Sequence, residues 1–272
     1  MSWTTMATES WTVRPADERL RPLVARDYVG FTESGAAGEG WLEAPGSRVT
    51  VILNLGERFG GLPQTFAAGL TDTWTWVERG DAISCLDLKL TPLGGYTLLG
   101  VPMHELAGRV VDACDLLGPA VPPLLDALRE ASDWEQRFRL LDRFLVRRAE
   151  HGPRPAEAVA WAWRRLVETG GQVPVSRLAE EVGWSHRHLV ARFREQVGLT
   201  PKTMARIVRF NRLLRGLEAG GGVRWAELAV DHGYYDQAHL HRDFRQFLGL
   251  TPAAYLARRG VTFFQDAPAT AS

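Results

Sequence analysis

Two spacings of apolar residues divide this chain. Between about residues 48 and 100, short apolar and β-branched runs are separated by turn residues, which is typical of β-strands. Strands are predicted over residues 49–56, 65–70, 73–78, 83–92 and 96–101. After Pro102 the apolar residues recur with the period of a helix, and helices are predicted over residues 103–113, 122–131, 134–150 and 156–171. The sequence HGPRP at residues 151–155 predicts a linker between two domains.

One pattern occurs twice in the second domain, at residues 178–201 and 228–252. The copies read LAEEVGWSHRHLVARFREQVGLTP and LAVDHGYYDQAHLHRDFRQFLGLTP. Matching residues are 50 positions apart before an internal turn and 51 positions apart after it. A solvated helical repeat array is one explanation, but such arrays need at least about three stacked units, and the sequence holds two copies.

Each copy has the residue spacing of a helix-turn-helix. An alanine on the first helix permits a close crossing, and a glycine four positions later can take the positive φ that turns the chain. These residues are Ala179 and Gly183 in the first copy and Ala229 and Gly233 in the second. Ser185 and Asp236 are the predicted N-caps of the second helices. The residues predicted on the buried face of those helices, spaced four apart, are Leu189, Phe193, Leu240 and Phe244.

The second copy also carries a long pattern of fixed residues. It reads A-x-x-x-G-Y-x-D-Q-A-H-L-x-R-x-F-R-x-x-x-G-x-T-P-x-x-Y from Ala229 to Tyr255. With this pattern, the last hundred or so residues resemble the DNA-binding domain of the AraC/XylS family of transcription regulators. The resemblance implies an all-α domain of two helix-turn-helix units, whose recognition helices enter successive major grooves of double-stranded DNA about 34 Å apart.

The same resemblance implies an N-terminal sensory domain, commonly a small cupin-like β-barrel followed by helices. The predicted fold class is therefore α+β. We expect a sensory and dimerisation domain at residues 1–150, a DNA-binding domain at 151–260 and a tail at 261–272. The implied function is sequence-specific DNA binding in transcription regulation, with RNA polymerase as an expected partner if the protein is an activator.

Side chains on the recognition helices are the predicted DNA contacts. Gln can pair with adenine and Arg with guanine in the major groove, while Arg and Lys also neutralise phosphates. The predicted contacts are His186, Arg187, Val190, Arg192, Arg194, Lys202, Gln237, Ala238, His241, Arg242 and Arg245. The family often has a long polar side chain where this chain has Val190 and Ala191. We therefore expect the first half-site to be read less stringently than the second.

Charge is distributed unevenly, although the formal net charge is zero. Residues 152–272 hold 17 Lys and Arg against 11 Asp and Glu, which leaves 15 against 21 for residues 1–151. A basic segment is typical of a phosphate-binding surface. Between the copies, Thr200 and Pro201 predict the start of a long helix that ends at three glycines. Its arginines either form a solvated face or approach phosphates: Arg206, Arg209, Arg212 and Arg215.

Aromatic residues of the first domain are candidates for effector binding, because a barrel can hold one small molecule. The candidates are Trp41, Phe66, Trp74, Trp76 and Tyr96. Aromatic residues at alternating strand positions, such as Trp74 and Trp76, are more often part of a core. Control by a small-molecule effector is the predicted role of this domain, and binding of a protein partner without an effector is the alternative.

The sequence does not indicate catalysis. Residues 48–100 contain no His, which argues against a metal-dependent cupin, and the two cysteines, Cys85 and Cys114, lack paired spacing. We therefore expect no enzymatic activity, no metal and no cofactor. A signal-peptide pattern and an apolar run of about 18 residues are both missing from the sequence, so we expect a cytoplasmic protein that does not enter a membrane.

A wide apolar stripe marks the helix predicted over residues 134–150. It consists of Phe138, Leu141, Phe144, Leu145 and Val146. One hypothesis is that the helices between residues 119 and 150 form a homodimer, which would place two DNA-binding domains on one operator. The alternative is that the stripe packs inside the subunit.

Overall fold

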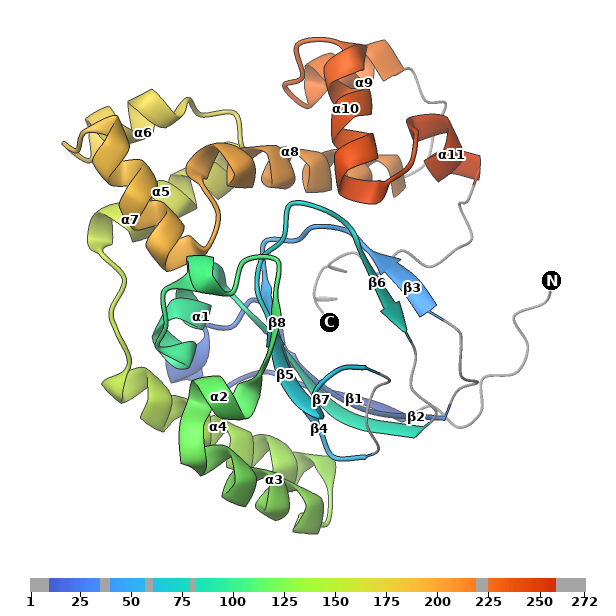
Figure 1. The fold of residues 1–272 in the computed structure, drawn as a ribbon, viewed down its shortest axis with the longest axis vertical. Coiled ribbons are helices and arrows are strands. Elements are labelled where there is room, and N and C mark those ends of the chain that lie inside the picture. The colour runs from blue at the N-terminus through green and yellow to red at the C-terminus, as the bar shows by residue number, and fades with distance from the viewer. Residues whose placement is uncertain (1–9, 35–39, 57–60, 79–81, 219–224, 258–272) are drawn as a thin grey trace.

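The protein combines a strand-rich amino-terminal part with a helical carboxy-terminal part (Figure 1). The computed structural model describes residues 10–34, 40–56, 61–78, 82–218 and 225–257. The α+β class is confirmed, while the predicted tail at 261–272 and the three glycines at 220–222 lie outside the described residues.

Six strands form one antiparallel sheet. In spatial order they are β1 (Ser10–Arg14), β2 (Tyr28–Ser34), β7 (Ala82–Leu90), β4 (Val49–Asn54), β5 (Thr65–Ala68) and β8 (Val110–Asp112). A separate two-stranded ribbon pairs β3 (Gly40–Glu43) with β6 (Thr75–Glu78). In the part of the chain that the structure describes, β1 and β8 are the edges of the larger sheet. Closure into a barrel therefore stays a prediction.

Apolar side chains lie on both faces of this sheet. On β4, Val51 and Leu53 belong to the main core, whereas Ile52 between them belongs to a second cluster on the other face. Successive side chains of a strand point to opposite faces, so the uninterrupted apolar run VIL at residues 51–53 follows from burial on both sides. Two antiparallel helices, α3 (Val121–Glu130) and α4 (Trp134–His151), cover the first face (Figure 1).

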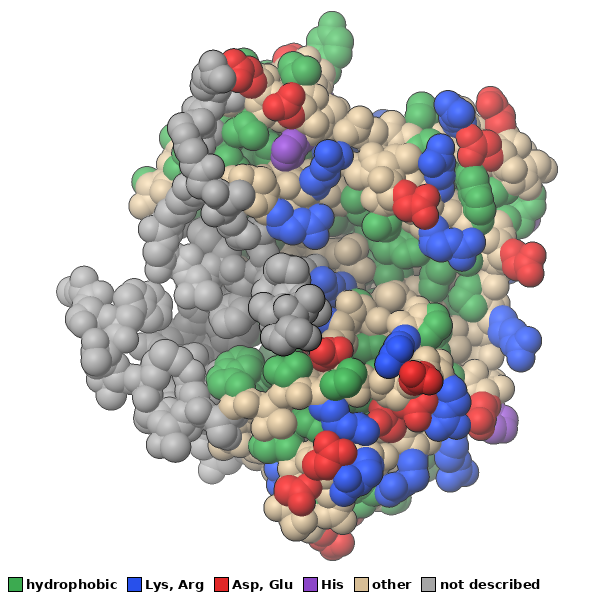
Figure 2. All heavy atoms as spheres, turned by 180° about the vertical axis from the view of Figure 1, so that it is seen from behind, with side chains coloured by type: hydrophobic (Ala, Val, Ile, Leu, Met, Phe, Trp, Pro, Cys, Tyr) green, Lys and Arg blue, Asp and Glu red, His purple; other side chains and the backbone are tan. Residues whose placement is uncertain are grey.

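The apolar stripe of α4 packs inside the subunit. Phe138, Leu141, Leu145 and Val146 are all buried in the main core, and Phe144 is partly buried against it. The outward face of α4 is charged, with Arg139 Nη1 3.2 Å from Glu135 Oε1. Figure 2 shows side chains of both charge signs mixed over the end of the molecule that α3 and α4 form. Internal packing thus accounts for the stripe, and homodimerisation stays a prediction without this surface as its basis.

One predicted strand is a helix. The sequence YTLLGV was predicted as a strand over residues 96–101, but α1 (Pro92–Leu99) covers most of it. The Thr91 side chain accepts a hydrogen bond from the Gly94 backbone N–H at 2.9 Å, and Pro92 occupies the first helical position. Because α1 packs against β7, α4 and α7, nearly all of its residues are apolar. A short apolar run without periodicity does not distinguish a buried helix from a buried strand.

The helix predicted over residues 103–113 is also wrong. The chain instead forms a short 3-10 helix, η2 (Met103–Glu105), followed by strand β8 and helix α2 (Ala113–Leu117). Strand β8 pairs with β5, so that Asp112 lies opposite Phe66. Strands β1, β2 and β3 lie before residue 48, where the apolar pattern did not predict them.

The carboxy-terminal helices confirm the predicted positions. A first group contains α5 (Glu157–Glu168), α6 (Val175–Glu181) and α7 (His186–Val197). The long helix α8 (Pro201–Glu218) leads to a second group of α9 (Trp225–Asp231), α10 (Gln237–Leu248) and α11 (Pro252–Ala257). Figure 1 shows α8 running between the two groups, above the sheet.

The strand-rich part contacts both helical groups. Helix α7 packs against α1 and η2. The Gln246 side chain on α10 donates to the Asp72 carbonyl oxygen at 3.2 Å, and the Asn211 side chain on α8 donates to that of Pro45 at 3.2 Å. The buried residues of both parts therefore form one continuous core.

Candidate nucleic-acid interface

The two repeats fold into two helix-turn-helix units with the predicted turns. Gly183 has φ 68° and Gly233 has φ 73°, a left-handed conformation that L side chains rarely adopt. The Ser185 hydroxyl accepts from the His188 backbone N–H at 3.2 Å, and Asp236 Oδ1 accepts from that of His239 at 2.7 Å. Both N-caps are confirmed, so α7 and α10 each begin at a defined residue.

The inner faces of α7 and α10 are held by the predicted apolar pairs. Their four residues, Leu189, Phe193, Leu240 and Phe244, are fully buried. Phe210 of α8 meets the Phe244 ring edge-on, with the ring centroids 5.0 Å apart. Ala179 and Ala229 are buried at the helix crossings. This packing fixes which faces of the two recognition helices point outward.

The outward face of α10 carries a stripe of polar and basic side chains. The stripe consists of Gln237, Ala238, His241, Arg242 and Arg245. Gln237 Nε2 lies 3.3 Å from His241 Nε2, one helical turn away. The Arg242 guanidinium reaches back to the Ala238 carbonyl oxygen at 3.4 Å and has no acidic partner among the described residues. Amide, imidazole and guanidinium groups on one face match the hydrogen-bonding edges of bases in a major groove.

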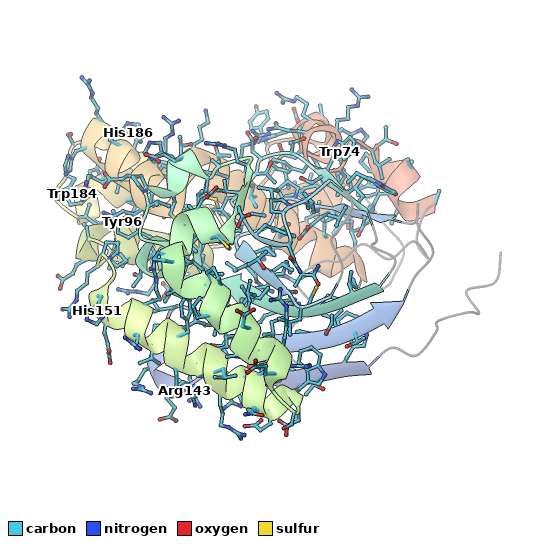
Figure 3. The ribbon with its side chains drawn as sticks, turned by 60° about the horizontal axis from the view of Figure 1, so that its bottom comes forward. Trp74, Tyr96, Arg143, His151, Trp184 and His186 are labelled. Carbon is cyan, nitrogen blue, oxygen red and sulfur yellow. The ribbon has the colours of Figure 1, made fainter. Side chains whose placement is uncertain are left out.

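The equivalent stripe of α7 is less polar in its middle. It consists of His186, Arg187, Val190, Ala191 and Arg194. His186 and Trp184, at the start of α7, lie at the outer edge of the molecule (Figure 3). Arg192 occupies the position in the first repeat that Asp243, a buried residue, occupies in the second, so it lies off the stripe. Its Nη1 atom lies 2.5 Å from Glu195 Oε2. Lys202 is exposed at the start of α8.

Two arginines of α8 have contacts within the protein. Arg206 Nη2 lies 2.6 Å from Asp243 Oδ1, a carboxylate that is fully buried on the inner side of α10. Arg209 Nη1 donates to the carbonyl oxygen of Gly233, in the turn, at 2.9 Å. Both residues hold the second unit on α8, so they do not form a merely solvated face, and phosphate contact by α8 stays a prediction.

Tyr234 and His239 complete the support of the second turn. Their rings meet edge-on with centroids 5.2 Å apart, and the Arg209 guanidinium lies 5.3 Å from the Tyr234 ring centroid. Burial, together with the nearby Asp243 carboxylate, raises the pKa of Tyr234 well above its ordinary value. Burial lowers the pKa of His239, which favours its neutral form.

The four candidate effector residues whose side chains are described do not converge on one place. Phe66 belongs to the second apolar cluster of the sheet, and Tyr96 packs on α1 against the main core. Trp74 and Trp76 are exposed, and Trp74 and Tyr96 appear at opposite sides of Figure 3. The Trp41 side chain lies outside what the structure describes. Effector contact by any of them stays a prediction.

Two features of the strand-rich part were not predicted from the sequence. A cavity of about 410 Å³ lies near α2 and α3, and residues of its lining include Gln64, Thr65, Asp112 and Cys114. On the face of the sheet opposite the helices, Arg26 pairs with Asp87 at 2.5 Å, and Lys89 Nζ lies 3.6 Å from the same carboxyl group. The charged residues inside the apolar run ISCLDLKL were a signal for this cluster, although Arg26, 61 positions away, was not predictable as their partner.

Within the described residues, no group of three or more metal-ligating side chains occurs. Among those same residues, no helix combines the length and apolarity needed to cross a membrane.

Comparison with known families identifies the helical part. A family model described as a helix-turn-helix domain matches residues 178–258, the segment that contains both repeats. These residues form an AraC-type helix-turn-helix domain. The residues that the two repeats share include the turn glycines and the inward-facing apolar pairs of α7 and α10.

The chain is similar to a bacterial regulator and, more distantly, to two solved structures. The YbfI protein of Bacillus subtilis (strain 168), described as an uncharacterized HTH-type transcriptional regulator, is 34% identical over 89 residues, which are 32% of either chain. The chain thus matches about a third of that relative's length. ToxT from Vibrio cholerae has 10% identity and a TM-score of 0.44, with 92% of this chain and 98% of that chain covered. The C-terminal domain of AraT, a response regulator from Geobacillus stearothermophilus, has 18% identity and a TM-score of 0.37, with 43% and 98% covered.

Proposed function

We propose that this protein is a sequence-specific DNA-binding transcription regulator and not an enzyme. The observation that carries the proposal is the pair of outward stripes on α7 and α10, each fixed by a capped turn and a buried apolar face. A single helix-turn-helix places its second helix in a major groove, and two units joined by α8 can occupy two grooves of one duplex.

The stripes differ in the bases they can read. On α10, Gln237 suits adenine and Arg242 suits guanine, each through a bidentate pair. On α7, the short apolar side chains of Val190 and Ala191 can contact a thymine methyl group but cannot reach a guanine edge. We propose that α10 supplies most of the sequence information, and that His186, Arg187 and Arg194 of α7 add base and phosphate contacts.

Replacing Arg242 by Ala is expected to weaken binding to the preferred duplex by about 1–3 kcal/mol and to relax one base position, because its guanine pair would be lost. Selection of duplexes from a random-sequence library, followed by affinity measurement for each variant, tests this. Arg143→Ala is a matched control, since Arg143 is exposed on α4, outside the helix-turn-helix domain (Figure 3). An unchanged consensus and affinity for Arg242→Ala would refute the assigned role.

For the strand-rich part we propose control by a small-molecule effector. The face of the sheet opposite α3 and α4 supports this, because the buried apolar cluster of Ile52, Phe66, Ile83 and Cys85 lies on the same face as the charged Arg26–Asp87–Lys89 group. An apolar surface with a few polar groups is typical of small-molecule sites.

A true effector is expected to raise the thermal midpoint of the protein, because a ligand that binds the folded state stabilises it by mass action. At a concentration of about 100 times the Kd, the stabilisation is about 2.7 kcal/mol. A thermal-shift screen of cellular metabolites measures this. A protein that is stabilised only by a protein fraction, and by none of the small molecules, would favour the alternative of a protein partner.

A further inference from the structure

The two helix-turn-helix units differ in the length of their turns. In the first unit, Gly183 and the N-cap Ser185 are separated by one residue. In the second, Gly233 and the N-cap Asp236 are separated by two residues. The glycines share a positive φ and the caps share one hydrogen-bonding pattern, so the helices on either side are equivalent. The second unit therefore contains one additional residue in its turn.

Side-chain packing shows which residue is additional. In the first unit the Trp184 ring meets His188 edge-on at 4.4 Å, and in the second the Tyr234 ring meets His239 edge-on at 5.2 Å. Trp184 and Tyr234 follow their turn glycines directly, while His188 and His239 each lie three positions after their caps. These aromatic–histidine pairs are structurally equivalent. Tyr235 then has no counterpart in the first unit.

Tyr235 also does not serve the packing of the domain. Its side chain is 92% exposed, more than any other large apolar side chain in the described part of the chain. The adjacent Asp236 carboxylate is engaged with the His239 backbone N–H at 2.7 Å. The fold thus places a tyrosine side chain in solvent just before the start of α10. The first unit has no corresponding residue before α7.

From this position we infer that Tyr235 contacts the duplex, and that its hydroxyl donates a hydrogen bond to a phosphate at the edge of the groove that α10 enters. The inference rests on the proposed DNA-binding function. Gln237 lies two positions after Tyr235 in the chain, so their Cα atoms are at most about 7 Å apart. The N-terminal residues of a recognition helix contact base edges, and the sugar–phosphate backbone borders that groove.

A hydroxyl contact to phosphate has a defined consequence for binding. Tyrosine is among the side chains that donate to phosphates and so set the register of a protein on DNA. Such a contact adds affinity without base preference. Because the phenol is neutral, it also leaves the salt dependence of binding unchanged, whereas loss of a phosphate-bound arginine reduces the slope by about one. We therefore expect Tyr235 to raise the affinity of the second unit for DNA of any sequence.

The experiment compares full-length Tyr235→Phe and Tyr235→Ala with the wild type, on the duplex that the wild type enriches most from a random-sequence library. Both variants are expected to bind about five- to tenfold more weakly, with an unchanged consensus and an unchanged salt slope. Val13→Ala, which changes a 61% exposed residue on β1, is expected to bind as the wild type does. Arg245→Ala is the comparison whose salt slope should fall.

The other possible results would overturn either the inference about Tyr235 or the proposed function. Tyr235→Phe binding as tightly as the wild type would overturn the phosphate contact, and a changed consensus for Tyr235→Ala would replace it with a base contact. Thermal midpoints that match the wild type show that the variants fold. If the wild type itself enriched no duplex, the proposed regulatory function would fail; if it did and both variants bound equally well, only the inference about Tyr235 would fail.

Discussion

Replacing Arg206 by Leu is expected to lower the free energy of unfolding of the helix-turn-helix domain by about 3–5 kcal/mol. The change leaves the fully buried Asp243 carboxylate without the guanidinium that lies 2.6 Å away. Removing one partner of a buried pair is costly because the remaining charge is neither paired nor hydrated. Chemical denaturation monitored by tryptophan fluorescence measures the loss.

Two further variants make this test specific. Arg215→Leu removes an exposed arginine from the same helix and should change stability by less than about 0.5 kcal/mol. The double variant Arg206→Leu with Asp243→Leu should recover much of the loss, since an apolar pair of similar volume often matches a buried ion pair. A double variant as unstable as Arg206→Leu alone would show that the destabilisation comes from lost packing and not from the unpaired carboxylate.

Replacing Leu141 by Ala is expected to destabilise the strand-rich part by about 2–5 kcal/mol. Leu141 is 1% exposed and belongs to the main core of the subunit, so the shorter side chain would leave a cavity. The neighbouring Leu140→Ala is the matched control, because Leu140 is only partly buried and its truncation should cost less. Thermal unfolding and sedimentation of the three proteins give the comparison.

The same variants separate internal packing from dimerisation. If Leu141 acts inside the subunit, the loss of stability in Leu141→Ala should be independent of protein concentration. The sedimentation coefficient of the folded protein should also be unchanged. A wild-type stability that rises with protein concentration, and a Leu141→Ala protein that sediments as a smaller species, would restore the apolar stripe of α4 as an interface.

The repeated units were predictable because their determinants are local. The caps Ser185 and Asp236, the turn glycines and the apolar pairs four residues apart each act within about one helical turn. The same kind of local signal occurs at Thr91-Pro92, where α1 begins. The apolar run of α1 nevertheless predicts a strand, because the helix is buried on several sides and no polar face marks a helical period.

Contacts between residues far apart in the chain could not be predicted from the sequence. Strand β8 exists because residues 110–112 complete a ladder with β5, more than forty positions earlier in the chain, and their own pattern resembles that of the neighbouring helices. The three-residue spacing of Arg206 and Arg209 predicted a common helix face. It could not predict that Asp243 and the Gly233 carbonyl would lie opposite them.

The sequence by itself determined the helix-turn-helix units, their caps and the side chains of the outward stripes, because these depend on contacts between residues a few positions apart. Only the tertiary structure decided that the α4 stripe is internal, that two arginines of α8 are structural, and that Tyr235 stands free in solvent. The physical reason is that burial depends on which distant segments meet. The local sequence around an apolar stripe, a row of arginines or a tyrosine is the same whether the tertiary structure buries those side chains or leaves them exposed.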